Sequence, residues 1–339
     1  MVGSLAAVLA VGVAVVGFVI FTGSEDSVPF LGGTREEPAE CPLTGLEPEQ
    51  PELAGRTAVA VKVENISAAR PQAGLNEADV VFEEPVEGGI TRFIAIYQCE
   101  QSPRIGPVRS ARFVDPAILV QYGNPIFGYS GAAQQVKDRI ADSGSLQDAS
   151  QDEAPDAYEL DPNLSAPHNV FTSLRALLDV GADRNAVPEP VFTYEEEPPS
   201  NQESKRGREL HLPFSPDADV FWRFARQQGV YLRAHGETDH TTEDGQQIVA
   251  ENVVVQVVEL QESGIVDAAG NPSPEVMATG SGNAFVFRDG RLIEGTWERP
   301  DVGEKTRFLD RNGEEIALAP GRTWVELFPR ELEAEIETG

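Results

Sequence analysis

Residues 57–65, 79–84 and 90–99 read TAVAVKVEN, DVVFEE and ITRFIAIYQC. Each run is rich in β-branched and aromatic residues, a composition that favours strands. The intervening PVEGG at 85–89 carries the proline and glycines typical of a turn, so the last two runs are close enough in sequence to pair. These segments predict three strands of one sheet.

After these strands, the spacing of hydrophobic residues changes from that of strands to that of helices. Asp115 followed by Pro116 is a favourable helix start, because aspartate can cap free N–H groups and proline suits the first helical position. PIFGYS at 125–130 is typical of a buried strand, and helical patterns follow at 131–144 and 169–183. This alternation of strands and helices predicts an α/β or α+β domain over residues 41–186.

The second half of the chain differs from the first in composition and in its hydrophobic pattern. Residues 187–210 are rich in Pro, Glu and Ser, and we interpret them as a linker. Beyond them, short runs such as ENVVVQVVEL and TWVELF are separated by DG, NG and PG turns, which predicts a mainly β domain over residues 211–330 and a tail at 331–339. We expect its tryptophans to pack in the core rather than to form a sugar-stacking surface: Trp222, Trp297 and Trp324.

The N-terminus carries an uncharged apolar run from residue 5 to residue 21. A membrane-spanning helix needs about 20 apolar residues, so this run predicts one transmembrane anchor, followed by a flexible polar stalk at 22–40. No Lys or Arg precedes Arg35, whereas Glu25 and Asp26 follow the run directly, which favours an extracytoplasmic main body. A cleaved signal peptide is the alternative.

The composition restricts the partners and the compartment. The formal net charge is -30, so the surface repels phosphate backbones and we expect no nucleic-acid partner. Outside the membrane, the two cysteines, Cys41 and Cys99, would most simply form one disulfide. Nothing in the sequence calls for a cofactor. The run with His235 and His240 matches no recognised metal-ligand spacing, so we expect a polar loop there and no metal site.

Four arginines gather within residues 86–115 of this acidic chain. Guanidinium groups bind phosphate or carboxylate through two parallel hydrogen bonds, so converging arginines can form an anion clamp. The alternative is that they make ordinary ion pairs with Glu83, Glu84, Glu87 or Asp115. The arginines are Arg92, Arg104, Arg109 and Arg112, and further polar residues that could line the same site are Asn65, His168 and Asn169.

Two catalytic patterns are also present, and each is weak. Ser130 lies between Gly128 and Ala132 where a strand passes into a helix, as a nucleophile would, with His168 as base and Asp138 or Asp161 to orient it. The pattern is imperfect, because a glycine is expected where Ala132 stands, and such a serine is far more often a helix cap. Glu83 and Glu84 could suggest glycoside hydrolysis, but neighbouring strand residues point to opposite sides of a sheet.

Several phrases are specific enough to indicate a family. They are CPLTG, ARPQAGLNEADVVFEEPVEGGITRF, IGPVRSAR and PHNVF in the first half, and NVVVQ, VFRDGRLIEGTW and TRFLDRNGEEIALAPGRTW in the second. With them, residues 41 to about 330 resemble the YerB-like family of bacterial membrane-anchored lipoproteins. The resemblance implies an envelope location and a two-part soluble region, and it assigns no reaction. No cysteine ends the apolar run to carry a lipid, which favours a transmembrane tether.

The sequence therefore predicts a single-pass cell-membrane protein with an extracytoplasmic body that binds an anionic cell-wall component or an envelope protein through its arginines. One alternative is a hydrolase or transferase acting on cell-wall polymers or lipid-linked precursors. Another is a scaffold for cell-wall enzymes. Arginines gathered with His168 around an open cleft would favour the enzyme, whereas arginines paired with buried carboxylates would favour the scaffold.

Overall fold

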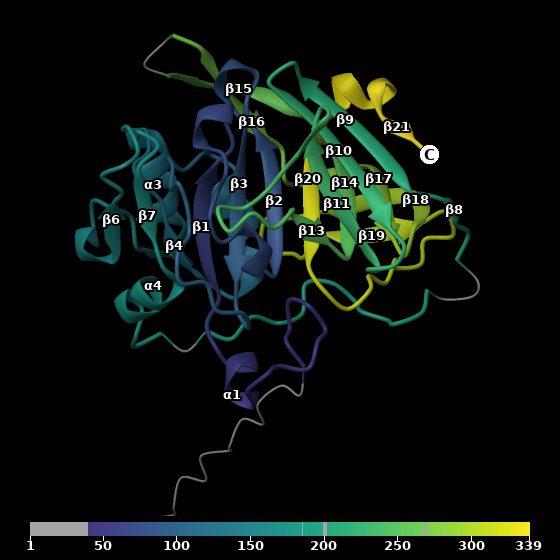
Figure 1. Ribbon diagram of the computed structural model, residues 1–339, viewed down its shortest axis with the longest axis horizontal. Coiled ribbons are helices and arrows are strands. Elements are labelled where there is room, and N and C mark those ends of the chain that lie inside the picture. The colour runs from purple at the N-terminus through teal and green to yellow at the C-terminus, as the bar shows by residue number, and fades with distance from the viewer. Residues whose placement is uncertain (1–39, 185, 199–201, 268–269) are drawn as a thin grey trace, which may run out of the picture. The chain divides into compact units, whose positions relative to one another are not determined.

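The computed structural model describes residues 40–184, 186–198, 202–267 and 270–339 (Figure 1). The expected membrane anchor at 5–21 and the stalk up to residue 39 lie outside these residues. Among the helices of the described ranges, none is long and apolar enough to cross a membrane.

One large sheet runs through the described part of the chain, with the strand order β19-β18-β17-β14-β20-β2-β3-β1-β4-β5 and β8 paired to β18. The first half contributes β1 Val59–Glu64, β2 Val80–Pro85, β3 Thr91–Tyr97, β4 Ile126–Gly128 and β5 Gln147–Asp148. The second half contributes β8 Lys205–Arg206, β14 Asn252–Val258, β17 Gly280–Arg288, β18 Arg291–Arg299, β19 Arg307–Asp310 and β20 Thr323–Pro329. The three strands expected from the opening segments are confirmed.

Strand β20 joins the two halves of the sheet. It lies between β2 and β14 and is parallel to both. Strands from the first and second halves of the chain are therefore direct neighbours, as Figure 1 shows for the yellow β20 beside the blue β2. Buried residues from both halves consequently form shared hydrophobic clusters.

A smaller sheet packs on one face of the large one. Its strands are β9 Glu209–Ser215, β10 Ala218–Ala225, β11 Val230–His235, β12 Thr238–Asp239, β13 Val249–Ala250 and β21 Glu337–Thr338. Trp222 and Tyr231 of the small sheet share a buried cluster with Phe93 and Trp324 of the large one. All three tryptophans are buried, so their expected role in the core is confirmed. The end of the expected tail forms β21, which pairs with β9.

Helices and short strands complete the fold. The helices are α1 Pro51–Ala54, α2 Asp115–Leu119, α3 Gln134–Ser143 and α4 Leu174–Val180. The 3-10 turns are η1 Ser67–Ala69, η2 Leu75–Glu77, η3 Glu87–Gly89, η4 Val120–Tyr122, η5 Pro155–Ala157 and η6 Arg330–Glu335. Two ribbons, β6 Tyr158–Leu160 with β7 Val170–Thr172 and β15 Leu260–Val266 with β16 Pro272–Val276, stand apart from the two larger sheets.

Helices α2 and α3 pack on the face opposite the small sheet, through Ile118, Leu119, Val136 and Ile140. The mixed α/β first half and the mainly β second half are confirmed.

Two local expectations need correction. The helix expected over 169–183 begins only at Leu174, because Val-Phe-Thr at 170–172 forms β7 and Ser173 caps the helix by accepting a hydrogen bond from the Ala176 N–H at 3.2 Å. Helix α2 does start at Asp115, but this carboxylate accepts from the Arg112 N–H at 2.7 Å and binds Lys62 instead of capping the helix.

The expected disulfide is confirmed. Cys41 and Cys99 are bonded across a sequence separation of 58 residues. Both cysteines are buried against Ala54 of α1. The bond thus ties the first described residues to the segment that follows β3.

Candidate functional site

The candidate site is built around Glu64 at the end of β1. The side chains of this strand alternate, so Lys62 and Glu64 point to the face of the large sheet opposite Val61 and Val63. The buried Glu64 carboxylate uses its two oxygens for two partners: Arg109 Nε lies 2.8 Å from Oε1, and His168 Nδ1 lies 2.7 Å from Oε2. Glu64 therefore draws together two of the residues expected from the sequence.

Arg92 stands beside this pair, and among the described residues it makes no ion pair with a carboxylate. It lies on β3 opposite Glu64, is only 5% exposed, and donates from Nη1 to the Ser110 carbonyl at 3.0 Å. Its Nε–H has no hydrogen-bond partner among the described residues. Burial, followed by the charges of Arg112 and Arg109, lowers the pKa of Arg92 to about 10. The guanidinium groups of Arg109 and Arg112 thus lie close enough to repel that of Arg92.

The three arginines differ in how many donors remain free. Arg112 donates from Nε and Nη2 to the Glu87 carboxylate, and from Nη1 to the carbonyls of Ser110 and Ala111. Arg109 uses only Nε; within the part of the chain that the structure describes, its Nη1 and Nη2 make no hydrogen bond, and its side chain is 23% exposed. Arg109 is therefore the guanidinium most available to a ligand.

Arg104 belongs to a different cluster. It binds three carboxylates, at 2.5 Å from Glu159, 2.6 Å from Asp161 and 3.2 Å from Glu243. Its guanidinium also lies 3.6 Å from the centre of the Phe171 ring. Arg104 shares no ion-pair partner with the other three arginines, so it contributes to the structure of its own loop cluster.

The remaining predicted residues are divided between the site and its surroundings. The Asn65 side chain lies on the opposite face of the sheet, where its amide donates to Glu83 at 3.0 Å and to Thr91 at 2.8 Å. Asn169 follows His168, and its backbone carbonyl accepts from the Asp161 N–H at 2.8 Å. Ser130 donates its hydroxyl proton to the Val108 carbonyl at 2.9 Å.

Glu64, rather than Asp138 or Asp161, orients the His168 ring. A carboxylate held against one ring nitrogen fixes the orientation of an imidazole, which could then exchange a proton with a bound ligand. Among the described contacts, no hydrogen bond joins Ser130 to His168, so the geometry gives Ser130 no base.

A buried ion cluster behind the site was missed from the sequence. Lys62 Nζ lies 2.8 Å from Asp115 Oδ1 and also binds the Glu84 carboxylate, and all three side chains are buried. Burial raises the pKa of Glu84 to about 7 even though the Lys62 charge opposes the rise. The signal was a single lysine among the valines of β1, because a strand that buries every residue must supply a partner for a charge.

A second buried cluster lies between the two sheets. Arg233 of β11 binds Glu83 of β2, and Trp222 Nε1 donates to Glu326 of β20 at 2.8 Å. As expected from strand alternation, Glu83 and Glu84 point to opposite faces and do not form a catalytic pair.

The two histidines considered for a metal belong to this second cluster. The Arg233 guanidinium donates to His235 Nε2 at 2.7 Å and to His240 Nδ1 at 2.5 Å. Burial first, and then the Arg233 charge, lowers the pKa of both imidazoles. They therefore act as neutral acceptors for an arginine.

Comparisons with known proteins agree with the fold and identify the family. Residues 43–187 match the family described as "Protein of unknown function (DUF3048) N-terminal domain", and residues 210–325 match its C-terminal domain. The chain is 30% identical over 321 residues to "Putative lipoprotein YerB" of Bacillus subtilis (strain 168), which covers 88% of this chain and 89% of that relative. A crystal structure of the YerB protein from Bacillus subtilis shares the fold, with a TM-score of 0.74 and 24% identity, over 88% of this chain and 99% of that chain. The chain therefore belongs to the DUF3048 family, and its expected resemblance to YerB-like proteins is confirmed.

Proposed function

We propose that this chain is an extracytoplasmic cell-envelope protein that binds an anionic group of a cell-wall component or partner protein at Arg109, supported by Arg92 and Arg112. The observation that carries the proposal is the imbalance at Arg92. Arg109 pairs with Glu64 and Arg112 pairs with Glu87, whereas Arg92, which both of these arginines repel, has no ion-pair partner among the described residues. A bound phosphate or carboxylate would offset this excess positive charge.

The partial exposure of the site makes it reachable. Arg109 and His168 have side chains 23% and 21% exposed, whereas Arg92 is buried behind them. An incoming anion would meet the free Nη1 and Nη2 of Arg109 first, and its charge would also act on Arg92. Because the chain is strongly acidic overall, binding of anions elsewhere on its surface is disfavoured.

Three observations favour the envelope location. The apolar run at 5–21 has the composition of a membrane anchor, and the name of the related Bacillus subtilis protein describes a lipoprotein. The disulfide between Cys41 and Cys99 also fits an oxidising compartment outside the cytoplasm.

The scaffold alternative draws support from the two arginines whose donors are used within the protein. Arg104 binds three carboxylates, and Arg112 is held by Glu87 and two backbone carbonyls. These contacts fit a structural role for both residues. Arg109 remains as the arginine that can bind an anion, so the function is tested by substituting Arg109.

Binding of a phosphate-bearing wall polymer tests the proposal. The full-length chain is titrated with poly(glycerol phosphate), and we expect Arg109→Ala to weaken binding about tenfold or more, because one charge-assisted contact is lost. Arg109→Lys keeps the charge without the planar fork and should recover part of the affinity.

The matched control is Arg175→Ala. The Arg175 side chain is 83% exposed, and among the described ion pairs it pairs with Asp179 alone, four residues later on α4, so its substitution removes the same charge outside the site. The proposal fails if the parent chain does not bind, or if Arg109→Ala and Arg175→Ala weaken binding equally.

A further inference from the structure

The Glu64 carboxylate is covered by its two partners. Its side chain is 1% exposed, whereas those of Arg109 and His168 are 23% and 21% exposed. Each partner binds through the nitrogen nearer its own backbone, Nε of Arg109 and Nδ1 of His168. The outer nitrogens, Nη1 and Nη2 of the guanidinium and Nε2 of the imidazole, are therefore left beside one shared carboxylate.

These outer nitrogens are free and reachable. In the part of the chain that the structure describes, none of the three makes a hydrogen bond, and none is enclosed by the protein. Arg92 differs, because its unpartnered Nε is buried. A ligand that binds the tip of Arg109 would consequently meet His168 Nε2 as well.

The two side chains offer opposite hydrogen-bonding groups. The outer nitrogens of Arg109 can only donate. Because the Glu64 carboxylate accepts from His168 Nδ1, this nitrogen carries the proton, and the neutral ring then presents Nε2 as an acceptor. The site therefore has donors for an anion next to an acceptor for a proton of the same ligand.

The neighbouring charges decide which kind of proton donor fits. Arg109 and Arg112 already repel Arg92, so an ammonium group brought to the same place would be repelled too. An anion without any donor would leave the Nε2 lone pair unpaired and facing negative charge. A neutral hydroxyl next to the anionic group meets both conditions.

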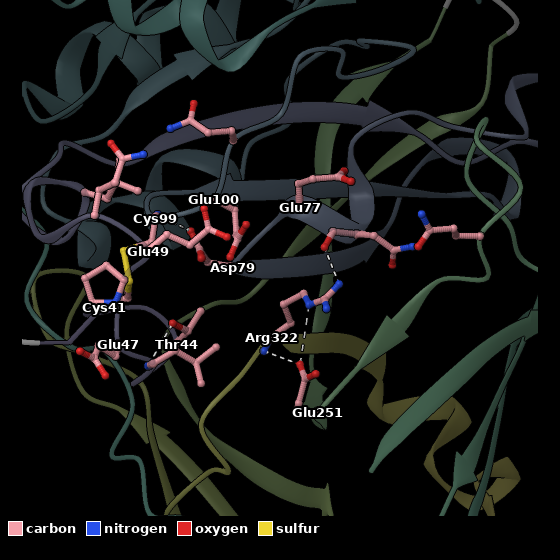
Figure 2. A pocket seen from close by; sticks show the side chains of 17 residues that line it. Cys41, Thr44, Glu47, Glu49, Glu77, Asp79, Cys99, Glu100, Glu251 and Arg322 are labelled. Atoms are coloured by element: carbon pink, nitrogen blue, oxygen red, sulfur yellow. Dashed lines mark hydrogen bonds and ion pairs between the residues drawn. A yellow bond between two sulfur atoms is a disulfide. The ribbon is translucent and has the colours of Figure 1, made fainter. Parts of the chain in front are cut away.

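A cavity of about 410 Å³ beside the disulfide has the opposite charge and does not compete for such a ligand. Figure 2 shows Glu77, Asp79 and Glu100 in this cavity, with Glu251 beside Arg322. Among the described residues that line it, carboxylates outnumber cations by six to one. This cavity repels anions, which favours their binding at Arg109 instead.

We propose that the ligand of the arginine site is a phosphate ester of a polyol, with its phosphate on Nη1 and Nη2 of Arg109 and a hydroxyl that donates to His168 Nε2. The assignment rests on the proposed anion binding at Arg109 and adds the substrate class. A glycerol phosphate unit has this arrangement, because a hydroxyl lies on the carbon next to the one that carries the ester. Such units occur in soluble polymers and in lipid headgroups.

Calorimetric titration of the full-length chain tests the assignment at pH 8, where an ordinary imidazole is neutral. Glycerol 3-phosphate is compared with propyl phosphate, which has the same phosphate and the same number of carbons but no hydroxyl. We expect glycerol 3-phosphate to bind about three- to tenfold more tightly, which is the contribution of one hydrogen bond. His168→Ala should bind both esters equally, whereas Arg109→Ala should weaken the binding of both about tenfold.

His211→Ala is the matched control. The His211 side chain is also 21% exposed, and its Nε2 lies 2.6 Å from the Asp219 carboxylate on the small sheet. We expect this variant to keep the preference for glycerol 3-phosphate.

Nitrogen-15 NMR of the parent chain gives a readout that needs no substitution. Glycerol 3-phosphate should shift the His168 Nε2 signal more than propyl phosphate does, and Nε2 should stay unprotonated in the complex. Poly(glycerol phosphate) and vesicles of phosphatidylglycerol are then added as competitors. Displacement by the polymer identifies a soluble polymer as the source of the unit, and displacement by the vesicles identifies a lipid headgroup.

The outcomes separate this assignment from the anion site on which it rests. If neither ester binds to the parent, the anion site itself is wrong. If both esters bind equally, if the preference survives in His168→Ala, or if Nε2 is protonated in the complex, the polyol assignment is overturned while the anion site stands.

Discussion

At the scale of single residues, the face of the sheet behind the arginine site is held by charges that have no access to water. Lys62 binds both Glu84 and Asp115, and all three residues are buried. Two carboxylates share one ammonium group, and burial keeps the pKa of Glu84 raised. The cluster positions Asp115 against the Arg112 backbone, so it also supports the segment that carries the arginines.

Removal of the shared cation should destabilise the fold strongly. Lys62→Met would leave Glu84 and Asp115 buried without their partner, and we expect the free energy of unfolding to fall by about 3–5 kcal/mol. Urea denaturation of the variant measures this loss. Lys137→Met is the control, because Lys137 pairs with Asp152 at the surface and should change the stability by at most about 1 kcal/mol. Equal effects of the two substitutions would contradict the role of Lys62.

Asp79 should make stability depend on pH. Its folded-state pKa is raised from 3.8 to about 7 by burial and by Glu100, while Arg56 and two backbone N–H groups oppose the rise. The folded state therefore binds more protons than the unfolded state between these values, so its contribution to stability is present below about pH 4 and is lost as pH rises through 7.

The comparison of Asp79→Asn with the parent isolates this contribution, because the other titrating groups are common to both. We expect the parent to lose up to about 4 kcal/mol relative to the variant between pH 4 and pH 8. Urea denaturation across this range measures the difference. A constant difference between the two proteins would show that Asp79 titrates normally.

At the scale of elements, local pattern predicted more of the fold than of the site. The runs around β1, β2 and β3 and the helical pattern of α3 were evident, because hydrophobic period and turn residues are local properties. The position of β20 between β2 and β14 was not, since the choice of neighbouring strands depends on packing between distant segments.

The same distinction applies to the candidate site. The sequence indicated Arg92, Arg109, Arg112 and His168. That Arg109 and His168 bind one carboxylate, Glu64, follows only from the register of β1 and the return of the chain after β6. Arg104 lies close to the others in sequence, yet it binds Glu159, Asp161 and Glu243, which are 55, 57 and 139 residues further along the chain.

The disulfide ties α1 and its flanking loops to the segment after β3. It closes a loop of 58 residues, which corresponds to about 4 kcal/mol when the unfolded chain is treated entropically. We expect the double variant Cys41→Ala, Cys99→Ala to lose about 2–4 kcal/mol of stability in urea denaturation. The parent under reducing conditions should show a similar loss. A loss below about 1 kcal/mol in both would mean that packing around Ala54 holds these segments without the bond.

At the scale of the described body, residues 40 to 339, the large sheet joins both halves of the sequence. Strand β20 fills the position between β2 and β14, and the buried clusters on both faces draw residues from either side of the expected linker. Arg233 of the second half also binds the buried Glu83 of the first. Separation of the halves would expose these apolar surfaces and leave buried charges unpaired.

We therefore expect residues 41–186 and residues 187–339 to be unfolded when each is produced alone. Co-expression should restore the native sheet, and the intact chain should unfold in one cooperative transition. Circular dichroism and amide NMR spectra of the separate and combined pieces measure this. Cooperative folding of either piece alone would show that the shared sheet is not needed for stability.

The proposed anion site is tested most directly by observing its guanidinium groups. The full-length chain with ¹⁵N-labelled arginine is titrated with methyl phosphate, and the Nε–H signals are followed by NMR. We expect the signals of Arg109 and Arg92 to shift together and saturate, while that of Arg104, held by three carboxylates, stays in place. Shifts at Arg104 instead, or uniform shifts that never saturate, would contradict an anion site at Arg109.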